Sequence, residues 1–108
     1  MSDILIGKGN LAGKGVYANK DFKKDEIVIQ YHLIPLTEAQ YEQLSEQEKM
    51  FTHRHWEVIY LYSEPERYVN HSNTPNTYQD LINKCDVALR DIKRGEMITG
   101  DATKDDIH

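Results

Sequence analysis

The sequence predicts a mostly β domain with several short twisted sheets and one helix in the middle. Short apolar runs recur along the chain between glycine and charged turns, and only one stretch has helical character. Strands do not alternate with long helices, which argues against a doubly wound parallel sheet. The 108 residues, of which 39% are hydrophobic, suffice for one domain with one modest core.

The first half of the chain predicts three strands. Residues 4–6 form an apolar run that should end at Gly7. Residues 13–15 (Gly-Lys-Gly) predict a tight turn, and residues 16–18 the strand that follows it. Residues 27–31 are rich in β-branched side chains and predict a third strand.

One helix is expected, in an insert of about residues 37–50. Thr37 is a suitable N-cap, and Gln40, three residues later, completes a capping box. Ser45 and Glu48 repeat this spacing, which predicts a break at Ser45. Four glutamates predict a solvated face, with a docking surface for a basic partner as the alternative: Glu38, Glu42, Glu46 and Glu48.

The second half of the chain returns to strand character. Residues 56–62 alternate, which places Val58, Tyr60 and Tyr62 on one face. Further short strands are expected at residues 68–69, 77–78, 86–89 and 97–98. The polar tail, residues 103–108, should fray.

Charge and cysteine content exclude several classes of protein. The net charge of −5 argues against direct nucleic-acid binding and suits a basic partner. Cys85 is the single cysteine, so neither an internal disulfide nor a cysteine-rich zinc cluster can form. The N-terminus lacks the features of a signal peptide, and no stretch approaches the roughly 20 apolar residues of a membrane span. We therefore expect no membrane association and a cytoplasmic or otherwise intracellular location.

Three sequence blocks in a fixed order carry a family resemblance. The first is Gly-Lys-Gly-Val-Tyr-Ala at residues 13–18, the second is Arg-Tyr-Val-Asn-His-Ser-Asn-Thr-Pro-Asn at residues 67–76, and the third is residues 88–99. A lone Gly-x-Gly is a weak motif, but Asn-His-Ser followed by Pro-Asn is far more specific. From about Leu5 to Asp101, the chain resembles the SET domain, the fold of protein-lysine methyltransferases.

The resemblance implies a single SET domain over residues 1–108, with a β-clip architecture. Its pocket-forming blocks would be residues 13–31, 67–78 and 88–102. The family's Asn-His segment also passes beneath a loop, which implies a pseudoknot-like C-terminal crossing. S-adenosyl-L-methionine is the implied methyl donor.

The resemblance also assigns site residues. Gly13 and Gly15 would let backbone groups approach the cofactor, and Asn70 and His71 would contact its methionine portion and adenine edge. The alternatives are a plain hairpin turn and a buried turn that satisfies backbone amides, while Arg67 could instead pair with a carboxylate. The expected cofactor-binding residues are Gly13, Lys14, Gly15, Tyr17, Arg67, Asn70 and His71.

Tyr60 and Tyr62 are the candidate catalytic residues. Aromatic rings in a channel can hold a lysine ammonium or a methylsulfonium by cation–π attraction. The alternative for both tyrosines is ordinary core packing on a strand face.

Two positions depart from the family pattern. Asn73 stands where the family commonly has a zinc-ligating cysteine, and His53 and His55 have no evident third ligand, so no metal is expected. The family's closing tyrosine position falls on Ala102, whose side chain cannot donate, accept or stack. Either activity is lost, or another tyrosine or a partner chain supplies the group, or the methyl acceptor differs.

The leading hypothesis is a protein-lysine N-methyltransferase that uses S-adenosyl-L-methionine, with catalysis impaired or altered at Ala102. Its substrate would be a basic protein or peptide that carries lysine. Self-association as a homodimer would compensate for the flanking segments that so short a chain lacks. The alternative is a non-catalytic SET-like module that binds S-adenosyl-L-methionine or a peptide.

Overall fold

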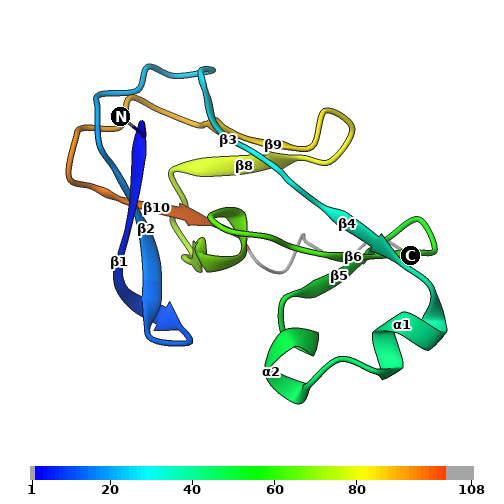
Figure 1. The fold of residues 1–108 in the computed structure, drawn as a ribbon. Helices are drawn as coiled ribbons and strands as arrows, with labels where there is room; N and C mark the ends of the chain where they lie inside the picture. Colours follow the sequence, from blue (N-terminus) through cyan, green and yellow to red (C-terminus); the bar gives the residue numbers. More distant parts are fainter. Residues whose placement is uncertain (1, 102–108) are drawn as a thin grey trace.

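The computed structural model describes residues 2–101 of the chain. Within this range the fold is mostly β, with three small sheets and a few short helices, as the sequence predicts. The β1–β2 hairpin (residues 4–18) and the β4-β6-β5 sheet (residues 34–61) lie at opposite ends of the molecule (Figure 1). Between them lie β3 (Ile27–Gln30), β8 (Thr77–Asp80) and β9 (Cys85–Ala88) (Figure 1). Ala102 and the tail, residues 103–108, lie outside the described residues.

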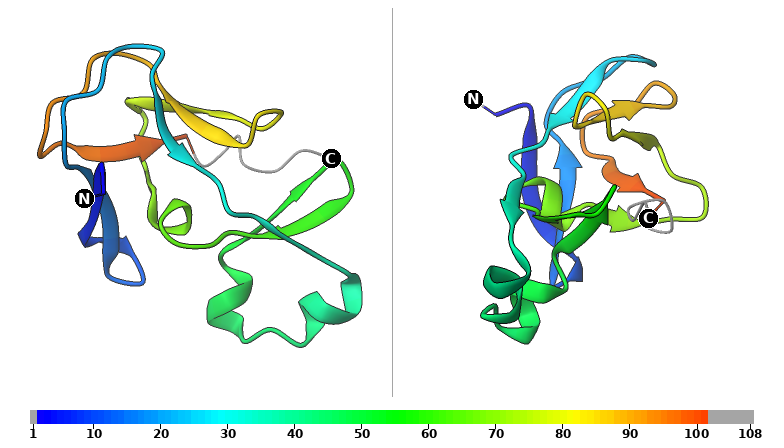
Figure 2. Two further views of the ribbon diagram at one scale, coloured as in Figure 1. Left: turned by 45° about the horizontal axis from the view of Figure 1, so that its top comes forward. Right: turned by 90° about the vertical axis from the view of Figure 1, so that its right-hand side faces the viewer.

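The first sheet contains both the first and the last strand of the described chain. Its strand order is β1-β2-β10-β7, with bounds Ile4–Leu11, Lys14–Ala18, Met97–Gly100 and Asn70–His71. β1 and β2 form an antiparallel hairpin, whereas β10 runs antiparallel to β2 and parallel to β7. β10, the C-terminal strand of this sheet, therefore lies between β2 and β7. Figure 2 shows β10, in orange to red, beside the blue β1–β2 hairpin (Figure 2).

Two boundaries predicted in this hairpin are wrong. β1 does not end at Gly7, because Gly7 pairs with Gly15 and the strand continues to Leu11 past an irregularity in register after Lys8. The turn does not span residues 13–15, since Ala12 and Gly13 have the positive φ angles of 54° and 79°, and β2 already begins at Lys14. Cross-strand pairing extends both strands beyond their apolar runs.

The second sheet has the order β3-β9-β8 and is antiparallel throughout, with bounds Ile27–Gln30, Cys85–Ala88 and Thr77–Asp80. These strands agree with the predictions for residues 77–78 and 86–89. Asp86 lies on the middle strand, with Ile29 and Gln79 as its neighbours across the two pairings. The arrangement buries an acidic side chain at the centre of the sheet.

The third sheet has the order β4-β6-β5, with bounds Ile34–Leu36, Val58–Leu61 and Thr52–His55. The expected strand over residues 56–62 is too long at its start. Trp56 and Glu57 have φ angles of 48° and 73° and form the β5–β6 turn. The expected strand at residues 68–69 is also wrong, because the chain forms the 3-10 helix η1 (Glu66–Tyr68) before β7.

The helical insert is broken at Ser45, as predicted, but it forms two short helices instead of one. α1 spans Glu38–Glu42 and has the expected capping box, in which Thr37 and Gln40 bond each other's backbone amides. α2 spans Glu46–Lys49, and the Ser45 hydroxyl accepts a hydrogen bond from the amide of Glu48. No helix among residues 2–101 has the length and apolar character needed to cross a membrane.

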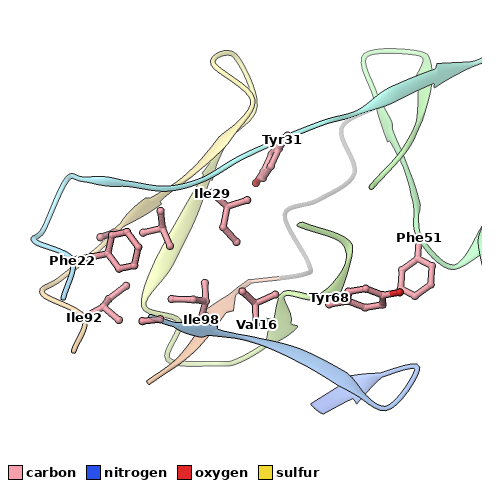
Figure 3. Close-up of a cluster of buried hydrophobic side chains, with 11 residues drawn as sticks. Val16, Phe22, Ile29, Tyr31, Phe51, Tyr68, Ile92 and Ile98 are labelled. Atoms are coloured by element: carbon pink, nitrogen blue, oxygen red, sulfur yellow. The ribbon is translucent and has the colours of Figure 1, made fainter. Parts of the chain in front are cut away.

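The hydrophobic core lies between the first two sheets and extends toward η1. Figure 3 shows Phe22, Ile92 and Ile98 at one end and the Phe51–Tyr68 pair at the other (Figure 3). The rings of Phe51 and Tyr68 meet edge to face, with their centroids 5.5 Å apart. This aromatic pair anchors the insert to the segment that precedes the Asn-His motif.

Candidate functional site

Asn70 connects three segments through its side chain. Its Nδ2 donates to the carbonyl oxygens of Lys14 and Tyr68, at 3.0 and 2.9 Å, and its Oδ1 accepts from the amide of Asn10 at 2.7 Å. The residue is 3% exposed. The amide side chain thus clamps the β1–β2 turn region onto β7, which is the backbone-satisfying role considered as the alternative for this residue.

Glycine is favoured at Gly13 and at Gly15 for different physical reasons. Gly13 has a φ of 79°, and no heavy atom lies within 4 Å of where its Cβ would be. Gly15 is in extended conformation, but a Cβ there would lie 3.2 Å from Asn70 Nδ2. Gly9, which sequence reasoning missed, is tighter still, because its Cβ would lie 2.3 Å from the carbonyl oxygen of Lys14.

Tyr17 and Lys14 pack against the hairpin and η1. The Tyr17 hydroxyl donates to the carbonyl oxygen of Lys8 at 2.6 Å, and its ring covers Gly7. The Lys14 ammonium lies 5.0 Å from the centroid of the Tyr68 ring. Both side chains therefore contact other parts of the protein. They lie beside the turn at which the resemblance implies a cofactor contact.

Arg67 pairs with a carboxylate, as the alternative prediction for it proposed. Its guanidinium makes a two-pronged contact with the Glu48 carboxylate, at 3.3 and 3.1 Å, and its Nε donates to the carbonyl oxygen of Tyr62 at 2.8 Å. The guanidinium also lies 4.6 Å from the centroid of the Phe51 ring. Arg67 therefore joins η1 to α2 and to the end of β6.

A cavity of about 210 Å³ brings residues of the motif together with residues of the other two sheets. His71 and Val69 come from the Asn-His block, Leu11 from β1, and Tyr62 from the end of β6. His71 is exposed, with Nε2 3.2 Å from Asn73 Oδ1 and Nδ1 3.8 Å from Asp101 Oδ1. The full lining is Leu11, Tyr31, Met50, Phe51, His53, Tyr62, Glu66, Arg67, Val69, His71, Gln79, Asp86 and Gly100.

The two candidate tyrosines have separate surroundings. Tyr62 is buried and lines the cavity, and its hydroxyl lies 3.2 Å from His55 Nε2. Tyr60 is half-buried and is absent from the cavity lining described above; Lys84 Nζ lies 4.7 Å from its ring centroid. Of the pair, only Tyr62 is positioned to touch a molecule in this cavity.

Three cavity residues outside the predicted set carry its polar chemistry. The Tyr31 hydroxyl donates a hydrogen bond to Asp86 Oδ1, and Glu66 lies close enough for its charge to act on Asp86. Burial, followed by the negative charge of Glu66, raises the pKa of Asp86 to about 7, although the Tyr31 hydrogen bond works in the opposite direction. The signal in the sequence was a lone carboxylate between Cys85 and Val87 in a strand.

No group of three or more His, Cys, Asp or Glu side chains suited to a metal ion occurs within residues 2–101. His53 and His55 share a strand face but pack against aromatic rings. The centroids of His53 and Tyr62 are 4.5 Å apart, and those of His55 and Tyr60 are 5.4 Å apart. These edge-on and tilted ring contacts pack both histidines against tyrosines.

Comparisons with known proteins agree on one family. The SET-domain family model matches residues 13–101. The human and mouse proteins named Histone-lysine N-methyltransferase 2D are each 30% identical to the chain over 115 residues, which covers 93% of it. The chain spans about 2% of the length of these relatives.

A crystal structure of a Plasmodium falciparum protein, described as a candidate histone methyltransferase, has a similar fold. Its TM-score is 0.72 at 22% identity, and the match covers 94% of this chain and 93% of that one. The structural match supports the fold, and the family model covers most of the sequence, including the Asn-His segment and the closing strand. The chain belongs to the SET-domain family.

Proposed function

We propose that the protein is a protein-lysine N-methyltransferase that uses S-adenosyl-L-methionine. The observation that carries the proposal is the cavity, which joins the Asn-His block of a SET domain to buried aromatic and acidic side chains. The relatives named as histone-lysine methyltransferases support a lysine-bearing protein as the acceptor.

The residues around the cavity fit a cationic methyl donor. S-adenosyl-L-methionine, when bound, supplies an electrophilic methyl group on a positively charged sulfur. Aromatic faces and a carboxylate stabilise such a charge, and both are present as Tyr31, Tyr62 and Glu66. Gly100, at the end of β10, keeps that part of the lining free of a side chain.

Other residues would hold and shield the donor. His71, Val69 and Leu11 lie on the motif side of the cavity, and Met50 and Phe51 add apolar surface to its lining. The open space beside Gly13 leaves room for a bound group to approach the turn. Both Nδ2 hydrogens of Asn70 are used within the protein, so its side chain would contact the donor through the second acceptor position of Oδ1.

A second candidate function is a non-catalytic SET-like module that binds S-adenosyl-L-methionine or a peptide. It is favoured by Ala102, which stands where the family's closing tyrosine would supply a hydroxyl. In the leading proposal, a hydroxyl in the cavity takes over part of the role of the closing tyrosine. Tyr62, one of the two candidate catalytic tyrosines, lies in the cavity lining. A cytoplasmic or intracellular location and a homodimer remain part of the proposal.

The test combines binding and transfer. Calorimetric titration with S-adenosyl-L-methionine measures binding, and transfer of a labelled methyl group to core histones and poly-L-lysine measures catalysis. We expect binding and slow transfer by the wild type, with faster transfer by Ala102→Tyr. Binding without any transfer by the wild type would select the non-catalytic module, and absence of binding would overturn both functions.

The two tyrosines provide a matched pair for the same assay. Tyr62→Phe removes a hydroxyl at the cavity, whereas Tyr60→Phe removes one outside its lining. We expect Tyr62→Phe to slow methyl transfer at least 10-fold and Tyr60→Phe to change it less than 3-fold. Equal effects of both substitutions would show that the cavity is not where transfer takes place.

A further inference from the structure

Asp86 is a buried carboxylate that faces the cavity with unused hydrogen-bonding capacity. It is 3% exposed and lies on the middle strand of the β3-β9-β8 sheet. Its Oδ1 accepts from the Tyr31 hydroxyl, and its Oδ2 has no hydrogen-bond donor among residues 2–101. A buried carboxylate oxygen that lacks a hydrogen-bond donor destabilises the folded protein. Its position beside a cavity therefore points to a ligand that supplies the donor.

Glu66, the other buried carboxylate of the cavity, is satisfied by the protein. Its Oε2 accepts from the backbone amides of His32 and Ser63, at 2.6 and 3.2 Å, and its Oε1 lies 3.4 Å from His32 Nδ1. Glu66 therefore closes the loop before η1 and presents negative charge to the cavity. Two carboxylates with such different surroundings are suited to two different tasks.

The groups that face Asp86 come from every element around the cavity. Tyr31 follows β3 and donates to it, Gln79 of β8 is its cross-strand neighbour, and Glu66 of η1 contributes negative charge. Figure 3 shows the Tyr31 ring pointing into the fold from the segment that follows β3 (Figure 3). The remaining titratable side chains of the cavity lining are His53, Tyr62, Arg67 and His71.

We propose that the Asp86 carboxylate, held in place by the Tyr31 hydroxyl, receives the ammonium group of the methyl acceptor in this cavity and takes its proton. This assignment rests on the proposed methyltransferase function. Asp86 is then a catalytic residue, because it touches the reacting amine, and Tyr31 is a positioning residue for it.

The proton transfer balances without any added reagent. One N–H bond of the ammonium breaks and one O–H bond forms on Asp86, which leaves the nitrogen lone pair free. That lone pair forms the new N–C bond to the methyl group, and the sulfur keeps the electron pair of the broken C–S bond. A neutral amine is required for this displacement, and an acceptor lysine in water is almost entirely protonated at neutral pH.

The environment of Asp86 suits this task. An ordinary Asp has a pKa about 6 below that of a lysine ammonium, so it is a poor base for one. With a pKa raised to about 7 by burial and by Glu66, Asp86 reduces that difference to about 3. At pH 8 it is still mostly ionised and available both to bind the cation and to take its proton.

The first test compares Asp86→Asn with Asp80→Asn in the intact chain. Asp80 is a carboxylate of the same sheet, bonded to Asn83 and absent from the cavity lining. We expect Asp86→Asn to bind S-adenosyl-L-methionine within 3-fold of wild type but to transfer methyl to poly-L-lysine about 100-fold more slowly. Transfer within 3-fold of wild type would overturn the role of Asp86 and leave the methyltransferase function standing.

The second test uses the ionisation of Asp86 itself and needs no methyl donor. In carboxyl ¹³C NMR titrations, we expect one aspartate to titrate near pH 7, to be absent in Asp86→Asn, and to move to lower pH when Nα-acetyl-lysine amide is added. Titration of every aspartate near pH 4, or a midpoint that the lysine probe leaves unchanged, would overturn the proposal.

Tyr31→Phe adds a variant that keeps the carboxylate. The Tyr31 hydrogen bond lowers the pKa of Asp86, so its loss should shift both the NMR midpoint and the acidic limb of the transfer rate to higher pH. A slower enzyme with an unchanged pH profile would contradict the positioning role. Failure of the wild type to transfer methyl at any pH would overturn the methyltransferase function together with the role of Asp86.

Discussion

The β1-β2-β10-β7 sheet and the cavity beside it use their polar side chains in opposite ways. In the sheet, Asn70 makes three hydrogen bonds within the protein, and Gly15 of β2 is packed against its side chain. In the cavity, the Asp86 carboxylate accepts a hydrogen bond from Tyr31 on Oδ1, and Oδ2 has no donor within the part of the chain that the structure describes. The difference teaches that Asn70 of the family motif holds the scaffold together, whereas Asp86, which lies outside the motif, offers an oxygen atom to a ligand in the cavity.

The largest expected effect is on the cavity side and concerns pH. The folded-state pKa of Asp86 is about 7, above the roughly 3.9 of an unfolded chain, so the folded protein holds more protons between these values. Its contribution to stability is therefore present below pH 4 and is lost as pH rises through 7, by on the order of 4 kcal/mol. Asp86→Asn should remove this loss in urea unfolding curves measured from pH 4.5 to 8.

The matched control for the pH experiment is Asp80→Asn. Hydrogen bonds from Asn83 lower the pKa of Asp80, so this group acts in the opposite direction and at more acidic pH. The Asp80 variant should keep the fall in stability between pH 5 and 7. If Asp86→Asn follows the same pH curve as the wild type, then Asp86 does not differ from the satisfied carboxylates and the comparison fails.

On the scaffold side, Asn70→Ala should destabilise the protein by about 3 kcal/mol. The substitution leaves the Asn10 amide and the carbonyl oxygens of Lys14 and Tyr68 without their partner. Asn73→Ala, an exposed amide in the same segment, should change the free energy of unfolding by less than about 0.5 kcal/mol. Similar values for both variants in urea unfolding would show that the clamp does not stabilise the hairpin.

Gly9→Ala tests the close approach within the hairpin. A Cβ at Gly9 would lie 2.3 Å from the Lys14 carbonyl oxygen. Because that oxygen belongs to the backbone, the clash can be relieved only by a shift of the strand, and the free energy of unfolding should fall by about 2 kcal/mol. Gly13→Ala meets no atom and should cost about 1 kcal/mol through its positive φ alone. A greater loss at Gly13, measured by thermal unfolding, would contradict the packing of β1 on β2.

Arg67→Met tests the link between the two regions and should have the smallest effect, about 1 kcal/mol. The Glu48 side chain is 40% exposed, so solvent screens the ion pair, and the lost bond to the Tyr62 carbonyl accounts for most of the change. Arg54→Met, which removes a more exposed pair with Glu38, should stay within about 0.5 kcal/mol. Equal losses for the two variants would place Arg67 among ordinary surface arginines.

Local features could be predicted from the sequence, and positions that depend on pairing could not. The Thr37 capping box and the break at Ser45 are confirmed, because each involves residues three apart. The predicted end of β1 and the predicted start of β6 were wrong, because cross-strand pairing and positive φ angles decide where these strands end and begin. Tyr60 and Tyr62 were predicted as a pair on one strand face, and only the tertiary structure distinguishes them, because Tyr62 lines the cavity and Tyr60 is absent from its lining.

The sequence by itself determined the family and the fold class, since the three blocks and their order are properties of the chain. It also predicts that the family's closing tyrosine position falls on Ala102, whose side chain has no hydroxyl. Only the tertiary structure decided that Asn70 is bonded to Asn10, 60 residues away, and that Tyr31 meets Asp86, 55 residues away. The physical reason is that burial and hydrogen-bond partnership depend on what long-range packing places beside a side chain, and these set its chemistry.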